Sequence, residues 1–91
     1  MIFRYEVYVD DSLKERVRKE IGSTFTIEDT ASGFSFSDGR DTGRLVFGDN
    51  FIRASGNRSV IPTAFAHVAE AVFEFRKNFG EYFRQHGGFC R

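Results

Sequence analysis

Hydrophobic and polar residues alternate with a period of two through much of the first sixty positions of the chain. The alternation begins in residues 2–9 (IFRYEVYV) and returns in four further segments, 23–29, 33–37, 44–47 and 51–55. A period of two is typical of strands with one buried face. Short turns rich in Gly, Asp and Asn separate the last four segments, and such short connections predict an antiparallel meander.

Between the first and second of these segments the pattern becomes helical. Leu13, Val17 and Ile21 recur at every fourth position, followed by a glycine. This spacing gives a narrow apolar stripe on an otherwise charged helix. Ser12 and Glu15 have the spacing of a capping box. The sequence therefore predicts a short amphipathic helix capped by Ser12.

A second and longer helical pattern runs from Pro62, which suits a first helical turn, to about His86. Its main apolar residues are spaced 3-4-3-4-3, and further apolar residues widen the stripe. Charged residues occupy the opposite side. The main stripe consists of Phe65, Val68, Val72, Phe75, Phe79 and Tyr82, and the flanking positions are Ala66, Ala69, Phe73 and Phe83.

The predicted element order is β-α-β-β-β-β-α within a single domain of residues 1–91. Helices at the ends of the chain with the strands mainly between them favour an α+β fold. We expect a two-layer sandwich, in which an antiparallel sheet of four to five strands packs against two helices and the C-terminal helix is long.

The predicted length of the C-terminal helix does not fit a compact domain. A helix over residues 62–86 would be roughly 37 Å long, whereas a domain of this size has a diameter of about 30 Å. Either the helix kinks at Gly80, or its last turns extend past the sheet. In the second case, the first helix or the first strand could still cover the aromatic side chains of these turns. An uncovered aromatic segment would be a surface for a partner or for self-association. Its residues would be Phe75, Phe79, Tyr82, Phe83 and Phe89.

The charge of the chain is balanced overall but unevenly distributed. Thirteen basic and thirteen acidic side chains give a formal net charge of zero. Residues 23–50 carry two basic and five acidic side chains, a net charge of −3, while residues 51–91 carry six basic and three acidic ones, a net charge of +3. The molecule is therefore expected to have an acidic middle and a basic C-terminal third.

The alternation also predicts which side chains lie on the sheet face that the helices leave open. Arginines beside aromatic residues on an open antiparallel sheet are a candidate platform for single-stranded nucleic acid. An ordinary solvated sheet face would have a similar composition, and acidic residues on the same face would weaken attraction to phosphate. The residues of this candidate face are Arg4, Tyr8, Arg44 and Arg53.

Few residues could carry catalysis or bind a metal ion. His67 lies at the edge of the apolar stripe, a position typical of a surface or capping histidine. His86 and Cys90 are four positions apart across two glycines, and two donors do not make a tetrahedral metal site. The loop Asp38–Gly43 matches neither the calcium nor the phosphate pattern. We therefore expect no enzyme activity, no metal and no cofactor. The remote alternative is a small enzyme that uses His67 or the carboxylates of this acidic loop.

The compartment follows from what the chain lacks. The first residues contain no apolar segment typical of a secretory signal, and no run of about 18 apolar residues could span a bilayer. A single cysteine cannot form an intrachain disulfide. We expect a cytoplasmic protein that does not enter a membrane.

These observations lead to two functional hypotheses. The first is a non-enzymatic protein-binding module that inhibits or regulates a larger protein or complex by covering its surface. As a class, such a module resembles phage- or plasmid-borne inhibitors and immunity proteins. The alternative is a homodimer that binds single-stranded nucleic acid through the open sheet face. The strands and long helix resemble the layout of transcriptional coactivator single-strand-binding dimers. The order after the first strand resembles double-stranded-RNA-binding domains with one strand more, but residues 62–73 (PTAFAHVAEAVF) lack their lysine cluster.

Overall fold

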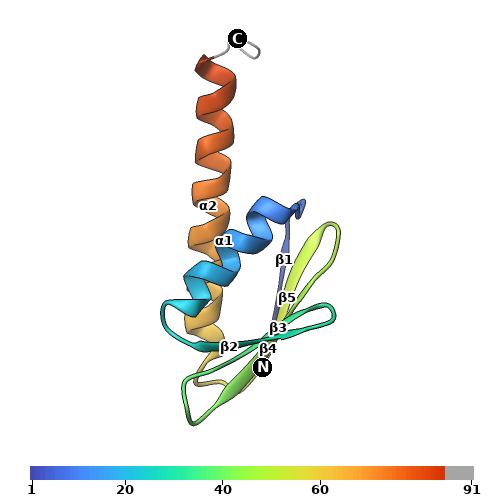
Figure 1. The fold of residues 1–91 in the computed structure, drawn as a ribbon, viewed down its shortest axis with the longest axis vertical. Helices are drawn as coiled ribbons and strands as arrows, with labels where there is room; N and C mark the ends of the chain where they lie inside the picture. The colour runs from blue at the N-terminus through green and yellow to red at the C-terminus, as the bar shows by residue number, and fades with distance from the viewer. Residues whose placement is uncertain (86–91) are drawn as a thin grey trace.

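The computed structural model describes residues 1–85, with side chains up to Glu74. It has the predicted α+β fold with the predicted order of elements (Figure 1). The strands are β1 (Ile2–Glu6), β2 (Thr26–Thr30), β3 (Gly33–Ser37), β4 (Thr42–Phe47) and β5 (Phe51–Gly56), and the helices are α1 (Asp11–Gly22) and α2 (Ile61–Gln85).

The five strands form one antiparallel sheet in the order β1-β5-β4-β3-β2. Strands β2 to β5 are the predicted meander, and β1 joins it at the far side of β5. Beyond the end of β1 the chain continues alongside the turn that precedes β5. The N–H groups of Val7 and Val9 donate to the carbonyl oxygens of Asn50 (3.1 Å) and Asp49 (3.0 Å) in that turn. The regular strand is thus shorter than the predicted 2–9, although its backbone contacts extend that far.

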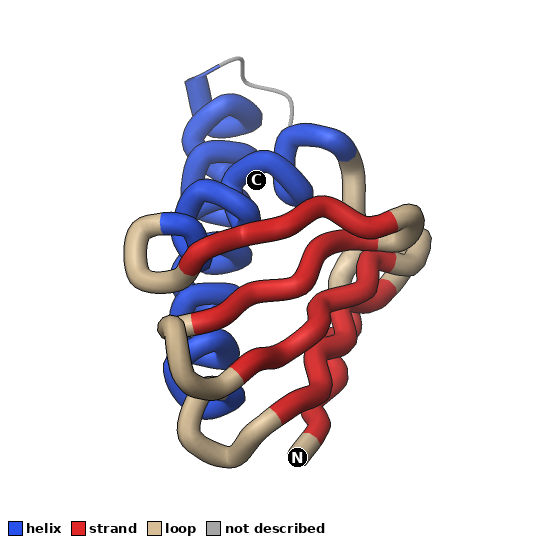
Figure 2. The backbone as a smooth tube through the Cα atoms, turned by 60° about the horizontal axis from the view of Figure 1, so that its bottom comes forward, coloured by secondary structure: helices blue, strands red, loops and turns tan. Residues whose placement is uncertain are grey.

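Both helices pack on the same face of the twisted sheet, which leaves the other face open (Figure 2). Along each strand, alternate side chains therefore enter the core or meet solvent. The burial pattern of β5 shows this alternation, with Ile52 and Ala54 buried and Arg53 and Ser55 exposed. The buried core consists of Val9, Leu13, Val17, Ile21, Phe25, Phe34, Phe36, Leu45, Ile52, Ala54, Val60, Ile61, Ala64, Val68, Ala71 and Val72.

The cap of α1 differs from the prediction. The carboxylate of Asp10, not the hydroxyl of Ser12, accepts the free N–H at the helix start, with 2.8 Å between Asp10 Oδ1 and Leu13 N. Asp10 has an extended backbone that suits an N-cap. The capping-box prediction was therefore wrong by two positions, and α1 begins at Asp11.

Two strand boundaries also differ from the prediction. β4 begins at Thr42 rather than at residue 44, because Gly43 lies directly opposite both Phe36 and Gly56 in the sheet. A Cβ atom on Gly43 would come within 2.4 Å of the Phe36 ring, so glycine makes room there for a core aromatic side chain. β2 begins at Thr26 rather than at residue 23. Ser23 and Thr24 instead form a turn, in which their N–H groups donate to the carbonyl oxygens of Glu20 and Ile21 at the end of α1.

The buried stripe of α2 is rotated relative to the prediction. Val68 and Val72 are buried as expected, but the fully buried set also includes Ala64 and Ala71. The small alanine side chains allow α2 to lie close to the elements it packs against. Phe65, which was placed in the main stripe, and Phe73 are left 44% and 61% exposed.

Helix α2 continues without a break through Gly80 to Gln85, and its length shapes the molecule. The principal extents are 48 × 22 × 20 Å, with α2 along the longest one. Its C-terminal turns, coloured orange-red to red, extend past both α1 and the sheet (Figure 1). Of the two alternatives for the long helix, the backbone therefore adopts the one in which the helix projects and does not kink.

Candidate interaction surfaces

The first candidate surface is the C-terminal part of α2. The helix contains four of the five residues predicted to contact a partner or a second copy, namely Phe75, Phe79, Tyr82 and Phe83. Phe75, Phe79 and Tyr82 continue the predicted stripe beyond Val68 and Val72, both of which are buried in the core. The fifth predicted residue, Phe89, lies outside the described residues.

The second candidate surface is the open face of the sheet. Arg4 on β1 lies directly opposite Arg53 on β5, and the Arg4 guanidinium carbon lies 4.0 Å from the centroid of the Phe51 ring. Arg44 on β4 lies opposite Ser55, two residues along β5 from Arg53. The sheet thus brings the three predicted arginines together on neighbouring strands.

Acidic groups reduce the positive charge of this open face. The Arg4 guanidinium forms an ion pair with Glu6 on the same strand. Glu28 on β2 faces the same side, because it lies opposite Ser35 in the register that also aligns Ser35 with Arg44. The remaining predicted residue, Tyr8, follows β1 and is 67% exposed. The face combines stacking groups and cations, but its net positive charge is small.

His67 occupies a structural position between α2 and the end of α1. Its Nε2 atom forms a hydrogen bond of 2.9 Å with the hydroxyl of Thr24, and its Nδ1 atom lies 3.6 Å from a carboxylate oxygen of Glu20. The ring also meets Phe25 edge-on, with 6.5 Å between centroids. These contacts connect the two helices and the turn after α1, so His67 is accounted for by packing and hydrogen bonding.

The acidic loop between β3 and β4 is ordered by its own backbone. The N–H groups of Asp41 and Arg40 each donate to the Asp38 carboxylate at 2.9 Å, and they lower the pKa of Asp38 below its ordinary value of 3.8. Asp41 accepts a hydrogen bond of 2.6 Å from the hydroxyl of Ser59, just before α2. This hydrogen bond connects the β3–β4 loop to the segment that leads into α2.

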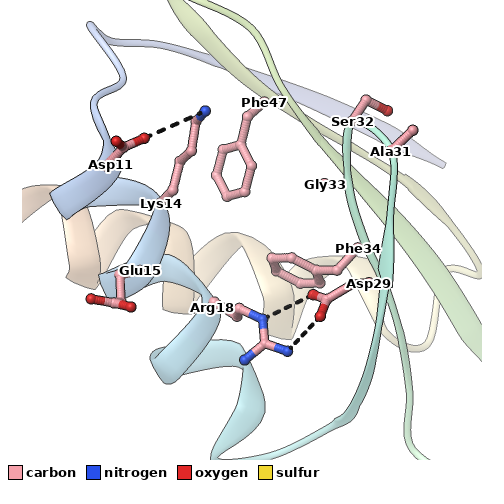
Figure 3. A pocket seen from close by; sticks show the side chains of 10 residues that line it. All are labelled: Asp11, Lys14, Glu15, Arg18, Asp29, Ala31, Ser32, Gly33, Phe34 and Phe47. Atoms are coloured by element: carbon pink, nitrogen blue, oxygen red, sulfur yellow. Dashed lines mark hydrogen bonds and ion pairs between the residues drawn. The ribbon is translucent and has the colours of Figure 1, made fainter.

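One concave feature was not anticipated from the sequence. A shallow cleft of about 410 Å³ lies between α1 and the turn that joins β2 to β3, beside Phe34 and Phe47 (Figure 3). Arg18 on α1 donates two hydrogen bonds of 3.0 Å to the carboxylate of Asp29 on β2. This pair ties the helix to the edge of the sheet. No local sequence pattern could reveal the cleft, because its two sides meet only when α1 packs on the sheet.

The described residues offer neither a candidate metal cluster nor a helix suited to crossing a membrane. Among residues 1–85, whose side chains are described up to Glu74, the structure shows no group of three or more His, Cys, Asp or Glu side chains that could hold a metal ion. Within the same part of the chain, no helix combines the length and the apolar composition needed to cross a membrane.

Comparison with protein-family models, with curated proteins and with solved structures found no match to this chain.

Proposed function

We propose that this protein is a non-enzymatic binding module that inhibits or regulates a larger protein or complex by covering part of its surface. The observation that carries the proposal is the projection of α2 past the sheet and α1, while its sequence keeps the apolar spacing of the packed part. The packed part uses Val68 and Val72 for the core. The later stripe residues lie on helical turns that extend beyond the sheet, and a partner surface is the proposed contact for them.

The unequal distribution of charge supports the same proposal. Residues 51–91 have a net charge of +3, and residues 23–50 have a net charge of −3. A partner with a complementary acidic surface would be attracted to the C-terminal part of the chain. Such complementarity increases the rate of encounter and helps to select the partner.

Affinity capture from the native host, followed by mass spectrometry, tests the proposal. The wild-type chain is compared with a Phe79→Ala, Tyr82→Ala, Phe83→Ala variant and with a Glu15→Ala, Lys19→Ala control on the exposed side of α1. We expect a protein partner that the control retains and the helix variant loses. Equal capture by all three chains, or capture of nucleic acid alone, contradicts the proposal.

A second candidate function is binding of single-stranded nucleic acid by the open sheet face. The arrangement that favours it is the adjacency of Arg4, Arg53 and Arg44, with Arg4 stacked over Phe51. Phosphate contacts by these arginines would make the affinity strongly dependent on salt. A mobility shift with labelled single strands that weakens in salt and in an Arg44→Ala, Arg53→Ala variant supports this function. No shift at low salt excludes it.

A further inference from the structure

Strand β1 lies at the edge of the sheet, and one side of its backbone is free in the described part of the chain. The N–H groups of Val7 and Val9 donate to the β5 side, which indicates that the odd-numbered positions bond within the sheet. The N–H and C=O groups of Ile2, Arg4 and Glu6 therefore point outward. A free edge of this kind is a template for pairing with another strand.

Exposed apolar side chains flank this free edge on both faces of the sheet. Ile2, at the start of β1, and Tyr8, two residues after its end, are 61% and 67% exposed. The flank of α2 that lies over β1 adds Phe65, whose ring packs against Phe3 at 5.1 Å between centroids. Phe73 is eight residues further along α2, about 12 Å along its axis. Phe65 thus borders the free strand edge from the side of the helices, whereas Ile2 and Tyr8 border it from the open face.

The structure assigns a second copy of this chain to the free edge: we propose a symmetric dimer in which two β1 strands pair antiparallel about Tyr5. In this register Arg4 of each copy lies opposite Glu6 of the other, so two pairs of opposite charges form on the open face. On the helix side, Phe3 lies opposite Val7 and the two Tyr5 residues face each other. The proposal does not depend on the function proposed above.

The same register also brings together the exposed apolar residues Ile2, at the start of β1, and Tyr8, two residues after its end. Ile2 of one copy would lie opposite Tyr8 of the other, which follows the end of β1, so these two exposed side chains would cover one another. Cross-strand pairs of apolar residues and of opposite charges are the contacts that stabilise antiparallel sheets. The self-complementarity therefore extends over the whole length of the strand.

Neighbouring registers lack this complementarity. Pairing centred on Arg4 would place the two Arg4 side chains opposite each other, and pairing centred on Glu6 would do the same with two glutamates. Like charges directly opposite destabilise a sheet. A register centred between two residues would align an even position with an odd one, whose N–H and C=O groups already bond to β5. Pairing about Tyr5 is thus the register among these that satisfies both charge and hydrogen bonding.

The position of α2 is compatible with this dimer. The helix contacts both β1 and β5, so it lies over the boundary between these two strands. With strands about 4.8 Å apart, the two α2 helices would lie about 10 Å from each other, near the upper end of the usual helix-packing distance. Phe65, Ala69 and Phe73 are spaced by four residues and would form the facing ridge.

The opposite edge of the sheet lacks these features. Strand β2 has the sequence TIEDT, and its two carboxylates would repel a second copy. Asp29 is held by Arg18 of α1, which covers this edge from the side of the helices. The two edges are therefore unequal, and only β1 offers a self-complementary strand.

Sedimentation equilibrium of the full chain tests the proposal with charge-reversed variants. We expect the wild type to dimerise, and the Arg4→Glu and Glu6→Arg variants each to associate about 10-fold or more weakly, because each places two like-charged pairs across the interface. Mixing the two variants restores opposite charges across the interface but not within either chain. A heterodimer in the mixture, at near wild-type affinity, is therefore specific to this register.

Other outcomes overturn the proposal. A wild type that stays monomeric up to the highest soluble concentration excludes it, as does a dimer that all the charge variants retain. The Phe79→Ala, Tyr82→Ala, Phe83→Ala variant serves as the matched comparison, and we expect it to dimerise normally. Loss of the dimer in that variant alone would assign self-association to the C-terminal part of α2 instead.

Discussion

The ring of Phe65 on α2 stands edge-on to the ring of Phe3 on β1, with an interplanar angle of 80° and 5.1 Å between centroids. Phe65 also lies 6.1 Å from the ring of Tyr5. These contacts fix α2 over the free edge of the sheet, even though Phe65 remains 44% exposed. The first strand and the long helix, which are far apart in the sequence, are thus joined by aromatic packing at the side of the molecule proposed to meet a second copy.

Phe3 and Phe65 should be energetically coupled. In a double-mutant cycle with Phe3→Leu and Phe65→Leu, measured by urea unfolding at low protein concentration, we expect a coupling of about 0.5–1.5 kcal/mol. The low concentration separates this contact from any dimer. Strictly additive effects of the two substitutions would show that the edge-on geometry contributes nothing to stability.

The N-cap of α1 can be tested by a matched pair of substitutions. Asp10→Ala removes the acceptor for Leu13 N–H and should lower the free energy of unfolding by about 1 kcal/mol. Ser12→Ala changes the residue favoured by the sequence pattern, and we expect a change within about 0.5 kcal/mol at this exposed site. The reverse order of effects would contradict the assigned cap.

Gly56 is required by its backbone and by its neighbours. It has a φ of +154°, and a Cβ atom there would lie 2.6 Å from both the Cα of Gly43 and the carbonyl oxygen of Thr42. We expect Gly56→Ala to destabilise the fold by at least about 2 kcal/mol. Gly39 also has a positive φ but open space around it, so Gly39→Ala should cost only about 1 kcal/mol. Equal losses in chemical unfolding would refute the steric argument.

Stability at low pH should depend on Asp38. The backbone N–H groups of Asp41 and Arg40 lower its pKa in the folded state, so the unfolded chain binds a proton more readily. The resulting stabilisation is fully present above the ordinary pKa of 3.8 and is lost as the pH falls through the lower, folded value. Asp38→Asn should therefore flatten the fall in unfolding free energy below about pH 3.8. An unchanged slope in urea titrations across this range would contradict it.

Local patterns predicted the element types well, because they depend on periodicity within a few residues. The alternation in residues 2–9 and the spacing of Leu13, Val17 and Ile21 correctly identified a strand and a buried helix face. The order of strands was less accessible. The pairing of β1 with β5 joins residues about fifty positions apart, and no local signal specifies it.

The prediction of surfaces was limited for the same reason. Arg4, Arg44 and Arg53 were assigned to the open face correctly, since a strand alternates regardless of its neighbours. Phe65 and Phe73 were assigned to the apolar stripe of α2, but their exposure depends on how the helix is rotated over the sheet. The rotation is set by tertiary packing, including the buried alanines of α2, which a hydrophobic pattern underweights.

The central claim is that the fold does not need the aromatic residues in the projecting part of α2. The most direct measurement is the unfolding free energy of the Phe79→Ala, Tyr82→Ala, Phe83→Ala variant, with Val72→Ala in the core as the reference. We expect the triple variant to lose less than about 1 kcal/mol, and Val72→Ala to lose about 1.5–3 kcal/mol. A loss of several kcal/mol in the triple variant, as for core phenylalanines, would show that these residues belong to the fold and would contradict the claim.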